Sequence, residues 1–541
     1  MRNFKKICAT IFAVSTLLPS FIFAENNNEY GSAKNVIMMI PDGYSIEIET
    51  ATRWTTAEKK LVLDDMVKGL VRVNNSNTPI ADSAPAATAM ATGSKTETPF
   101  ISCYPTKDGM PGFYDFDKNK AKMPLATVLE GAKRSGRSTG IVSTSNIQHA
   151  TPAAFCSHYP NRNEYEILGE QQVYQDMDVV LGAGSQYLDA SKRKDKEDLI
   201  NEIKSLGYDY FTTKAEMDKT TSNKIWGMFA EKSMKYDIDR DPSVEPSLAE
   251  MTTKAINTLS KNDKGFFLMV EGSEIDWGAH ANDPVATITD AIAFDKAVAV
   301  AKEFVKKTPN SVLIVAADHG TGGMTFGSTG INSGYDKTEL DKFTNLVANA
   351  KMTGQKVAEK LDDNRTNIKD IMKEAYAIND LTAEEENLIK TADKKDLQTA
   401  VGKVVSDRSY IGWTTRGHVG GDIALHCLTN GDNLKTLEGT IFNNQIGLYM
   451  ADVLDIDLNK LTNELYVCAR EAFIKKGAKV EYSKASEDNY ELKVTKDNNV
   501  LIIPMNKNYA KLNGKKVTIG GLAINTSNKV YLPQKAIELI K

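Results

Sequence analysis

Histidine and cysteine are both scarce in this chain, which has six histidines and five cysteines in 541 residues. No two cysteines have the CxxC spacing, so a zinc knuckle is excluded. One cysteine, Cys8, lies in the apolar N-terminal segment. The other four could form two disulfides in any of three pairings or remain buried thiols, and the sequence leaves both states open for Cys103, Cys156, Cys427 and Cys468.

The sequence also lacks a strong excess of either charge. The formal net charge is −5 and no long basic block is present, so we expect no nucleic-acid partner. Internal repeats and low-complexity tracts are absent. Beyond the N-terminus no segment is long and apolar enough to span a bilayer, so we expect no membrane span in the mature chain. A chain of this length is expected to form a large domain with insertions or an appended module.

The N-terminus is predicted to be a signal peptide, residues 1–24. A basic start precedes the apolar run 7–23, and Ala24 offers a small residue at the cleavage site. An uncleaved membrane anchor is less favoured, because the run is short and contains Pro19. We therefore expect an exported protein, periplasmic or secreted.

Short apolar runs alternate with amphipathic helical patterns along most of the chain. The runs that indicate buried strands are 35–40, 139–144, 179–181, 266–270 and 311–316. This alternation predicts an α/β fold: a three-layer sandwich whose central, mostly parallel sheet is covered by helices on both faces. Polar residues follow these runs, and in such sheets ligands bind at the carboxyl ends of the strands, so we expect these turns to converge on one crevice.

Two segments differ from this pattern. Residues 331–405 are helical in pattern and rich in Lys, Asp and Asn, which indicates an inserted subdomain. Residues 470–541 contain short alternating strands, and Asn513-Gly514 is a two-residue hairpin signal. We expect a main domain over residues 25–469 and a small β-rich C-terminal module over residues 470–541.

The segment 271–280 has the spacing of a metal site. Glu271 ends an apolar run, and Asp276 and His280 are four residues apart, which places them on one face of a helical turn. His319, which follows Asp318, and His418 lie in Gly-rich turns. Each of these residues alone is equally compatible with a hydrogen-bonded turn residue.

Ser83 begins a small-residue segment that reads as a helix ending at Gly93. Pro85 suits the first helical turn, and a helix N-terminus attracts anions. Ser83 is therefore a candidate nucleophile toward a phosphate ester. A plain helix cap is the commoner role for a single serine.

In this order, the segments resemble the alkaline phosphatase family from Asp42 to His418. The motifs that carry the resemblance are MIPDG (39–43), ADSAPAATAMATGSKT (81–96), QHATPAAFCSHYPNRNEY (148–165), LGAG (181–184), KGFFLMVEGSEIDWGAHANDP (264–284), AADHGTGG (316–323) and TTRGHVGGD (414–422). Residues 25–469 would then be an alkaline phosphatase-like catalytic domain, and the resemblance suggests a homodimer.

The resemblance implies a site with three metal ions. The first zinc ion would be held by Asp276, His280 and His418. The second zinc ion would be held by Asp42, Asp318, His319 and Ser83. The third ion, usually magnesium, would be held by Asp42, Thr151 and Glu271.

The implied reaction is hydrolysis of small-molecule phosphomonoesters to an alcohol and inorganic phosphate. Two zinc ions would neutralise the ester and lower the pKa of Ser83, which would form a phosphoserine intermediate. Arg162 would clamp the phosphoryl oxygens with a bidentate contact. Without the surrounding motif, Arg162 would be taken for an exposed loop arginine.

Two positions depart from the best-known bacterial pattern. His149 stands where that pattern has Asp, and Trp277 stands where it has Lys. Because imidazole favours softer ions than magnesium, the third site could hold magnesium or instead zinc, cobalt or manganese, with His149 as a ligand.

Other functions explain these motifs less completely. Sulfatases, phosphodiesterases and phosphonate hydrolases share the fold, but the sulfatase motif needs Arg where Ala87 stands, and the phosphodiesterases usually present Thr as nucleophile. A metal-storage or surface-binding protein, with the C-terminal module as an adhesin, would explain the ligands but not Ser83 or Arg162.

Overall fold

The computed structural model describes residues 28–112, 116–484 and 489–541. The predicted signal peptide, residues 1–24, lies outside the described residues. Within them, no helix has the length and hydropathy needed to cross a bilayer.

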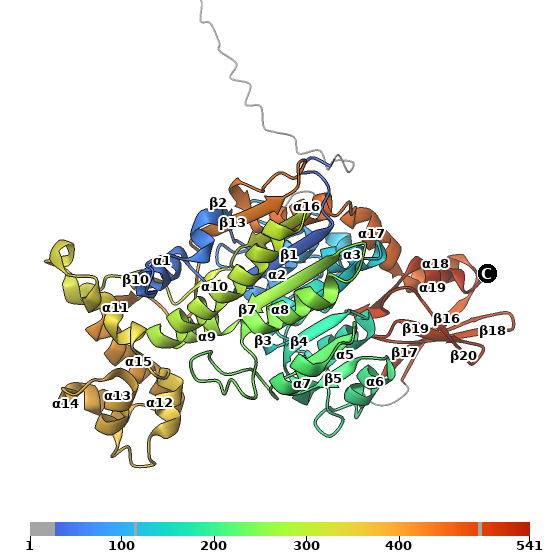
Figure 1. The fold of residues 1–541 in the computed structure, drawn as a ribbon. Helices are drawn as coiled ribbons and strands as arrows, with labels where there is room; N and C mark the ends of the chain where they lie inside the picture. Colours follow the sequence, from blue (N-terminus) through green and yellow to red (C-terminus); the bar gives the residue numbers. More distant parts are fainter. Residues whose placement is uncertain (1–27, 113–115, 485–488) are drawn as a thin grey trace, which may run out of the picture.

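A ten-stranded sheet forms the centre of the molecule (Figure 1). Its strands, in spatial order, are β14 (Gly439–Phe442), β2 (Val67–Arg72), β13 (Ile423–Asn430), β8 (Ser311–Val315), β1 (Asn35–Pro41), β7 (Phe266–Gly272), β3 (Ser138–Asn146), β4 (Val179–Ala183), β6 (Ile225–Met228) and β5 (Asp209–Phe211). All neighbours from β8 to β5 are parallel, and only β13 runs antiparallel to its neighbours. The predicted mostly parallel sheet is confirmed.

Strand β1 shows why the apolar runs predicted this sheet. It lies between β7 and β8, and all seven of its residues are buried. A strand covered on both faces needs apolar side chains in both directions, so it reads as a continuous run such as Val36–Ile40.

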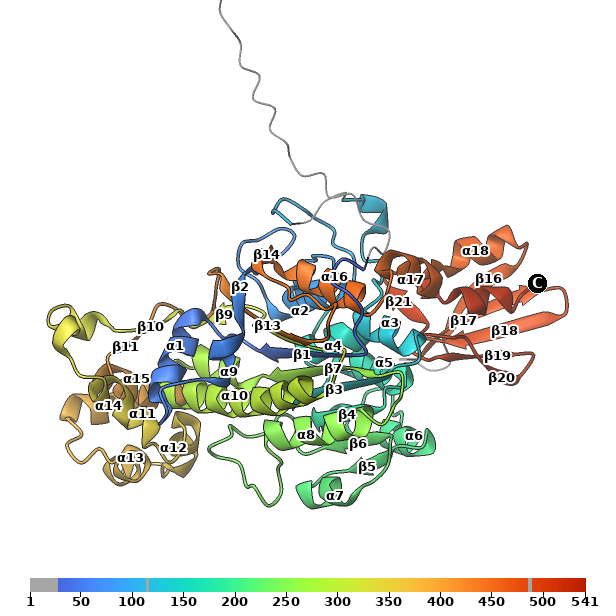
Figure 2. The same ribbon diagram turned by 45° about the horizontal axis from the view of Figure 1, so that its top comes forward.

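Helices cover both faces of the sheet, which confirms the three-layer sandwich. One layer contains α2 (Ser83–Thr92), α3 (Val128–Arg134), α4 (Ala150–Cys156) and α16 (Asn443–Val453). The other contains α1 (Ile46–Thr55), α8 (Leu248–Leu259), α9 (Glu274–His280) and α10 (Pro284–Lys307). In Figure 2, α2, α3 and α16 lie above the central strands, and α8 and α10 lie below them.

Local sequence signals fix where the long helices begin. Asp283 caps α10: its carboxylate accepts hydrogen bonds from the backbone N–H groups of Val285 and Ala286 at 3.0 and 3.2 Å. Pro284 occupies the first turn, where its missing N–H costs nothing. Ser247 and Glu250 form a capping box at the start of α8. These caps set the first turn of each of the two helices.

The predicted insertion forms a helical subdomain. It contains α11 (Asp341–Ala348), α12 (Gly354–Lys360), α13 (Ile368–Tyr376), α14 (Ala383–Thr391) and α15 (Leu397–Arg408). The chain enters it from β10 (Met324–Phe326) and returns into β11 (Ile411–Trp413), and these two strands pair antiparallel. The insertion therefore extends from one pair of adjacent strands and leaves the central sheet uninterrupted.

The C-terminal module is β-rich, as predicted. Its strands are β15 (Val467–Cys468), β16 (Lys479–Lys484), β17 (Tyr490–Lys496), β18 (Asn499–Pro504), β19 (Tyr509–Leu512), β20 (Lys515–Thr518), β21 (Ile524–Thr526) and β22 (Lys529–Leu532), with α18 (Ala469–Lys475) and α19 (Gln534–Glu538) beside them. Helix α17 (Leu458–Leu465) precedes the module. Asn513 and Gly514 have φ of 49° and 83°, the positive values of the predicted two-residue hairpin turn.

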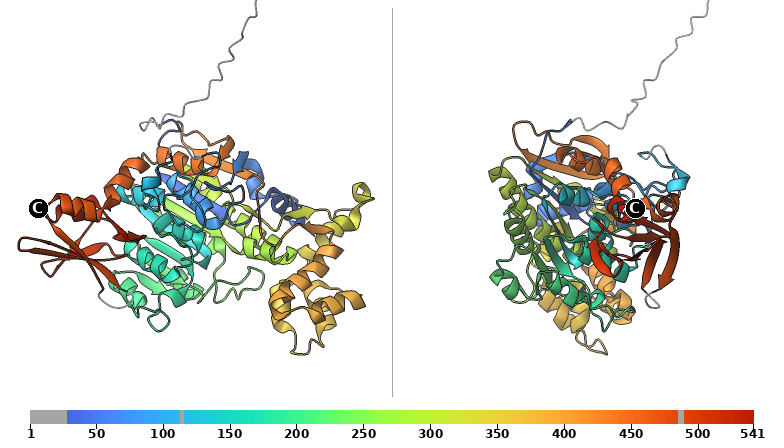
Figure 3. Two further views of the ribbon diagram at one scale, coloured as in Figure 1. Left: turned by 180° about the vertical axis from the view of Figure 1, so that it is seen from behind. Right: turned by 90° about the vertical axis from the view of Figure 1, so that its right-hand side faces the viewer.

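The module has a hydrophobic core of its own, which begins at Ala469, and we propose that the domain boundary lies there. Figure 3 shows the module and the helical insertion at opposite ends of the sandwich. Cys103, Cys156, Cys427 and Cys468 are free thiols in this structure. The alternative of two disulfides, left open by the sequence, is therefore not supported.

The module docks on α5 (Tyr165–Gln175) of the main domain. Lys507 lies 2.6 Å from a carboxylate oxygen of Glu197 and 3.4 Å from one of Glu170. The Asn506 amide donates to Glu170 at 2.8 Å. Glu170 is buried, and burial, together with the charge of Glu197, raises its pKa to about 7. Lys507 is thus the cation that compensates a buried carboxylate across the interface.

Lys507→Met should destabilise the docked module. Removing one partner of a buried ion pair leaves the other charge unpaired, so we expect a loss of about 2–4 kcal/mol at pH 8. Glu170 has a folded pKa above its ordinary value, so it takes up a proton as the pH falls below about 7. The loss should therefore shrink by pH 5.5. Urea unfolding at both pH values measures it.

The matched control is Lys515→Met, which changes an exposed lysine of the β19–β20 hairpin. It should leave the free energy of unfolding within about 0.5 kcal/mol of the wild-type value. Equal stability of the two variants at pH 8 would show that the interfacial pair contributes nothing.

Candidate metal centre

Acidic and imidazole side chains gather at the carboxyl ends of the central strands. Asp42 follows β1, Glu271 is the penultimate residue of β7, and Asp318 comes three residues after the end of β8. Residues 40 and 271 are register partners, so the ends of β1 and β7 are level. The predicted convergence is seen here. The turn at 182–184 packs against Gln148 and Asn146 instead, and supports the loop before α4.

The first cluster contains Asp276, His280 and His418. The Nε2 atom of His280 lies 3.3 Å from Oδ2 of Asp276 and 3.1 Å from Nε2 of His418. The Nε2 atom of His418 lies 3.8 Å from Oδ1 of Asp276. The spacing of four residues on α9 does place Asp276 and His280 side by side.

The hydrogen bonds of the two rings fix which nitrogens carry hydrogen. Nδ1 of His280 lies 2.5 Å from the carbonyl oxygen of Arg416, and Nδ1 of His418 lies 2.8 Å from that of Ala81. A carbonyl only accepts, so each Nδ1 is the donor and each neutral ring keeps a lone pair on Nε2. Two lone pairs 3.1 Å apart repel each other, and a cation between them removes that repulsion.

The second cluster contains Asp42, Asp318 and His319, whose ligand atoms all lie within 4.8 Å of one another. All three side chains are completely buried. Nε2 of His319 lies 3.2 Å from Asp318 Oδ2 and 3.2 Å from the hydroxyl oxygen of Ser83. The candidate nucleophile therefore touches this cluster directly.

Thr321 joins the first two clusters. Its hydroxyl donates to Asp276 Oδ1 at 2.5 Å, so its oxygen is left to accept from Nδ1 of His319 at 3.2 Å. That bond leaves the lone pair of His319 on Nε2, facing Ser83 and Asp318. Sequence reasoning missed Thr321, because its position in the Gly-rich turn does not indicate which side chains it contacts.

The third cluster contains Asp42, His149 and Glu271, again within 4.8 Å. One carboxylate oxygen of Glu271 accepts a hydrogen bond from Ser143 at 2.6 Å. The Nε2 atom of His149 accepts a hydrogen bond from the Arg162 guanidinium at 2.9 Å, because a guanidinium only donates. The neutral ring then carries its hydrogen on Nδ1, so His149 must give up this bond before it can bind an ion. Ser143 holds Glu271 in place, and the sequence did not indicate this role.

Several buried polar atoms of these clusters lack a hydrogen-bond partner within the described part of the chain. They are both carboxylate oxygens of Asp42, Thr151 Oγ1, Glu271 Oε1, Asp318 Oδ2 and His149 Nδ1. Burying such groups unpaired costs free energy, and charged groups cost the most. The first two clusters combine imidazole nitrogens with carboxylate oxygens, which suits zinc, and the third is richer in oxygen. The residues present therefore fit metal ions.

The pKa values of two of these carboxylates are raised because they are buried close to other carboxylates. Burial, and then the charges of Asp318 and Asp276, raise the pKa of Asp42 well above its ordinary value. Burial raises the pKa of Glu271 to about 7. Bound cations would reverse both shifts, because they stabilise the charged carboxylates.

Ser83 and Arg162 meet through Asp82. Ser83 is the first residue of α2, and Asp82 precedes it as the N-cap. The Arg162 guanidinium donates to Asp82 Oδ1 at 2.5 Å, and its side chain is only 14% exposed. Arg162 is therefore not an exposed loop arginine. Sequence reasoning missed Asp82, although it directly precedes Ser83.

Comparisons with known proteins identify the family to which the chain belongs. A family model described as alkaline phosphatase matches residues 33–456, and one described as copper amine oxidase N-terminal domain matches residues 454–539. The chain is 35% identical to alkaline phosphatase 4 of Bacillus subtilis (strain 168) over 458 residues, which covers 81% of this chain and 92% of that protein.

Two solved structures are also similar. The cold-active alkaline phosphatase of a psychrophilic Shewanella species is 30% identical with a TM-score of 0.67, over 78% of this chain and 99% of that one. The alkaline phosphatase of the Antarctic bacterium TAB5, in a histidine-to-aspartate variant with magnesium bound in its M3 site, is 24% identical with a TM-score of 0.56, over 79% and 99% of the two chains.

Zinc binding to the metal-free protein should release protons and weaken on acidification. Burial alone would lower the pKa of His280, but the hydrogen bond and charge of Asp276 raise it. A protonated ring cannot be a ligand, so below this raised pKa zinc competes with a proton and its affinity falls. Calorimetric titration at pH 6, 7 and 8, in buffers of different ionisation enthalpy, measures affinity and proton release together.

His426→Gln is the matched control, because His426 is a buried histidine beside Glu49, outside the three clusters. It should keep the wild-type pH dependence, whereas His280→Gln should lose zinc affinity and proton release. A zinc affinity that is independent of pH would contradict the assignment of His280.

Proposed function

The chain belongs to the alkaline phosphatase family, and we propose that it hydrolyses phosphomonoesters through a phosphoserine intermediate on Ser83. The observation that carries this proposal is the position of the Ser83 hydroxyl. It lies at the N-terminus of α2, 3.2 Å from the ring of His319 in the second cluster. A hydroxyl beside metal-ligating groups and at the positive end of a helix is suited to attack a phosphate ester.

We propose that the three clusters hold two zinc ions and a third divalent ion. Asp276, His280 and His418 would hold the first, and Asp42, Asp318, His319 and Ser83 the second. Asp42, His149, Thr151 and Glu271 would hold the third, which is magnesium or a softer ion such as zinc, cobalt or manganese. When bound, these ions would neutralise the phosphate dianion and lower the pKa of the Ser83 hydroxyl.

Ser83 would accept the phosphoryl group in the first step and release it in the second. The Ser83 oxygen attacks phosphorus while the bond from phosphorus to the alcohol oxygen breaks, and the alcohol leaves. Water then hydrolyses the phosphoserine, which releases inorganic phosphate and restores Ser83. In both steps Ser83 lies in line with the group that leaves or enters.

Arg162 would orient the phosphoryl group. Its guanidinium carries five N–H donors and engages Asp82 and His149 through two different nitrogens. Asp82 holds the Arg162 guanidinium beside Ser83, so Asp82 is a positioning residue for phosphate binding. These partners, half-buried Asp82 and buried His149, already restrict the Arg162 side chain, so it would lose less conformational freedom when it binds phosphate.

The other functions fit the site less well. A metal-storage protein does not need a hydroxyl at the end of a helix beside the clusters, and Ser83 has that position. A sulfatase would need Arg where Ala87 stands, and phosphodiesterases of this fold usually lack the third metal site, which Thr151 and Glu271 favour here. We further propose that the protein is exported, from the predicted signal peptide at 1–24, and that it acts on small phosphomonoesters as a homodimer.

Ser83→Ala should remove most phosphatase activity and leave the fold and bound zinc in place. Asp42, Asp318 and His319 remain to hold the second ion, but the group that accepts the phosphoryl is lost. Removing such a nucleophile lowers kcat by several orders of magnitude. Hydrolysis of p-nitrophenyl phosphate, metal content and circular dichroism measure the three properties.

The contrast is Arg162→Ala, which should raise KM more than it lowers kcat. Acid quenching of wild type during turnover should trap phosphate on Ser83. Label on another residue, or a Ser83→Ala enzyme within about tenfold of wild type, would mean that the nucleophile is misassigned.

His149→Asp should increase the affinity of the third site for magnesium. A carboxylate adds a hard oxygen ligand and negative charge next to Asp42 and Glu271, whereas imidazole favours softer ions. A histidine-to-aspartate variant of the TAB5 enzyme has magnesium bound in its M3 site, and we propose that His149 is the corresponding residue here. Magnesium titration followed by metal content and by activation measures the effect.

His149→Asn serves as the control, because it removes the imidazole without adding charge. We expect a smaller gain in magnesium affinity for it than for His149→Asp. If neither variant changes metal preference, His149 is not part of the third site.

A further inference from the structure

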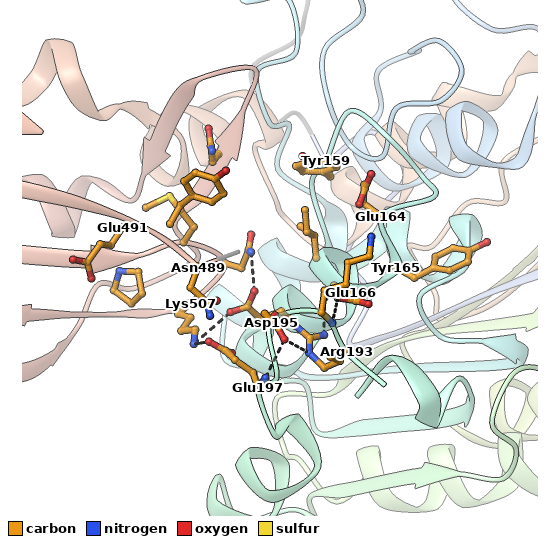
Figure 4. Close-up of a pocket in the computed structure, with 18 of the residues that line it drawn as sticks. Tyr159, Glu164, Tyr165, Glu166, Arg193, Asp195, Glu197, Asn489, Glu491 and Lys507 are labelled. Carbon is orange, nitrogen blue, oxygen red and sulfur yellow. Dashed lines mark hydrogen bonds and ion pairs between the residues drawn. The ribbon is translucent and has the colours of Figure 1, made fainter. Parts of the chain in front are cut away.

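A cleft of about 570 Å³ separates the C-terminal module from the main domain. One wall is formed by α5 and the segment 185–197, and the other by β17, β18 and β19 (Figure 4). Ligand-binding pockets have volumes of roughly 300–1,000 Å³, so this one can hold a small organic ligand. The proposed catalytic chemistry makes no use of it.

The floor of the cleft is closed by paired charges. Glu170, Asp195 and Glu197 have carboxylate oxygens within 4.8 Å of one another, a grouping that could hold a metal ion. Lys507 contacts Glu170 and Glu197, however, and Arg193 forms an ion pair with Asp195. Cations of the protein thus compensate this group, so we do not take it for a metal site.

The other end of the cleft is lined by residues next to Arg162, the proposed phosphate-binding residue. Asn163, Glu164 and Tyr165 line the cleft and directly follow Arg162 in sequence. Asn163 is bonded to Arg162, so the wall of the cleft begins one residue from the proposed phosphate-binding side chain. The alcohol portion of an ester whose phosphate is held by Arg162 could therefore enter the cleft along this wall.

The lining combines aromatic rings with amides. Tyrosines stand on both walls: Tyr159, Tyr165 and Tyr187 on the main domain, and Tyr490 and Tyr509 on the module. Their rings offer flat apolar faces, and their hydroxyls, with neighbouring Asn side chains, can both donate and accept hydrogen bonds. Such a surface suits a ligand with apolar C–H faces edged by hydroxyl groups.

The charge of the lining excludes other ligands. More carboxylates than cations line the cleft, and of the cations Arg193, Lys194, Lys507 and Lys511 the first and third are paired with carboxylates. A polyanion such as a nucleic acid would meet like charge there, so we expect an occupant without negative charge apart from its terminal phosphate. A long alkyl chain would leave the amides and hydroxyls without partners.

We propose that this cleft binds the alcohol portion of the substrate, and that this portion is a neutral sugar or short oligosaccharide. The enzyme would then prefer phosphorylated glycans to small phosphate esters. The proposal rests on the phosphomonoesterase activity proposed above. It makes the module part of the substrate site.

The test compares phosphorylated sugars of increasing length. We would measure kcat/KM for the mono-, di- and trisaccharide 1-phosphates of glucose, mannose and N-acetylglucosamine, with p-nitrophenyl phosphate as the small reference ester. In at least one series kcat/KM should rise tenfold or more from the mono- to the trisaccharide. The reference ester reports on the catalytic centre alone.

Tyr490→Ala and its matched control Tyr482→Ala distinguish an effect of the cleft from an effect of changing the module elsewhere. The two tyrosines lie on neighbouring strands and are 45% and 42% exposed, but only Tyr490 lines the cleft. Tyr490→Ala should abolish the dependence on length, Tyr490→Phe should retain most of it, and Tyr482→Ala should match wild type. All three should hydrolyse the reference ester at the wild-type rate.

Binding without turnover gives an independent measurement. The phosphate-free trisaccharide of the best series should give saturation-transfer NMR signals with wild type and Tyr482→Ala but not with Tyr490→Ala. A wild-type enzyme that hydrolyses the reference ester but shows no length dependence in any series would overturn the cleft proposal alone. No hydrolysis of any monoester would overturn the proposed function instead.

Discussion

The structure depends above all on negative charge buried at the carboxyl ends of its central strands. Asp42 and Asp318 are completely buried, and both oxygens of Asp42 lack hydrogen-bond partners. Buried carboxylates that repel each other favour unfolding unless they take up protons or cations. Among the described residues, Asp318 Oδ1 accepts hydrogen bonds from the backbone N–H groups of Gly43 and His319, but Asp318 Oδ2 and both oxygens of Asp42 accept none. The ring hydrogens of His280, His418 and His319 point to Arg416, Ala81 and Thr321, away from these oxygens. The site is therefore arranged for cations rather than for protons.

Distant parts of the chain supply this arrangement. His418 lies on the short strand β12 (His418–Val419), which pairs with β9 (Gly320–Thr321), the strand that contains Thr321. The carbonyl of Arg416 accepts the hydrogen of the His280 ring. The Arg416 side chain in turn forms an ion pair at 2.8 Å with Asp396 of the helical insertion. Orienting bonds of this kind set the tautomer and basicity of a ligand. The insertion, although it contains none of the proposed ligands, thus contacts the loop that orients one of them.

The predictions from sequence were right where the determining interactions are local. Continuous apolar runs predicted the parallel strands, and the four-residue spacing of Asp276 and His280 predicted their contact on α9. The free state of the cysteines was not predicted, because pairing depends on distances that the sequence does not contain. The roles of Asp82, Ser143 and Thr321 were missed for the same reason: each acts through a partner at least 45 residues away. The docking of the module through Lys507 and Glu170 was equally hidden, since the two residues are far apart in the chain and each alone looks like a solvated charge.

Docking of the module and binding in the cleft are linked by thermodynamics. The two walls of the cleft belong to different folding units, joined by polar contacts such as those of Lys507 and Asn506. A ligand that contacts both walls binds only the docked state, so it must stabilise docking by the same free energy by which docking improves its binding. The buried carboxylate of Glu170 therefore has two consequences. Its contacts with Lys507 and Asn506 help to hold the module in place, and on the proposal made above the docked module encloses the alcohol portion of a substrate whose phosphate is held by Arg162.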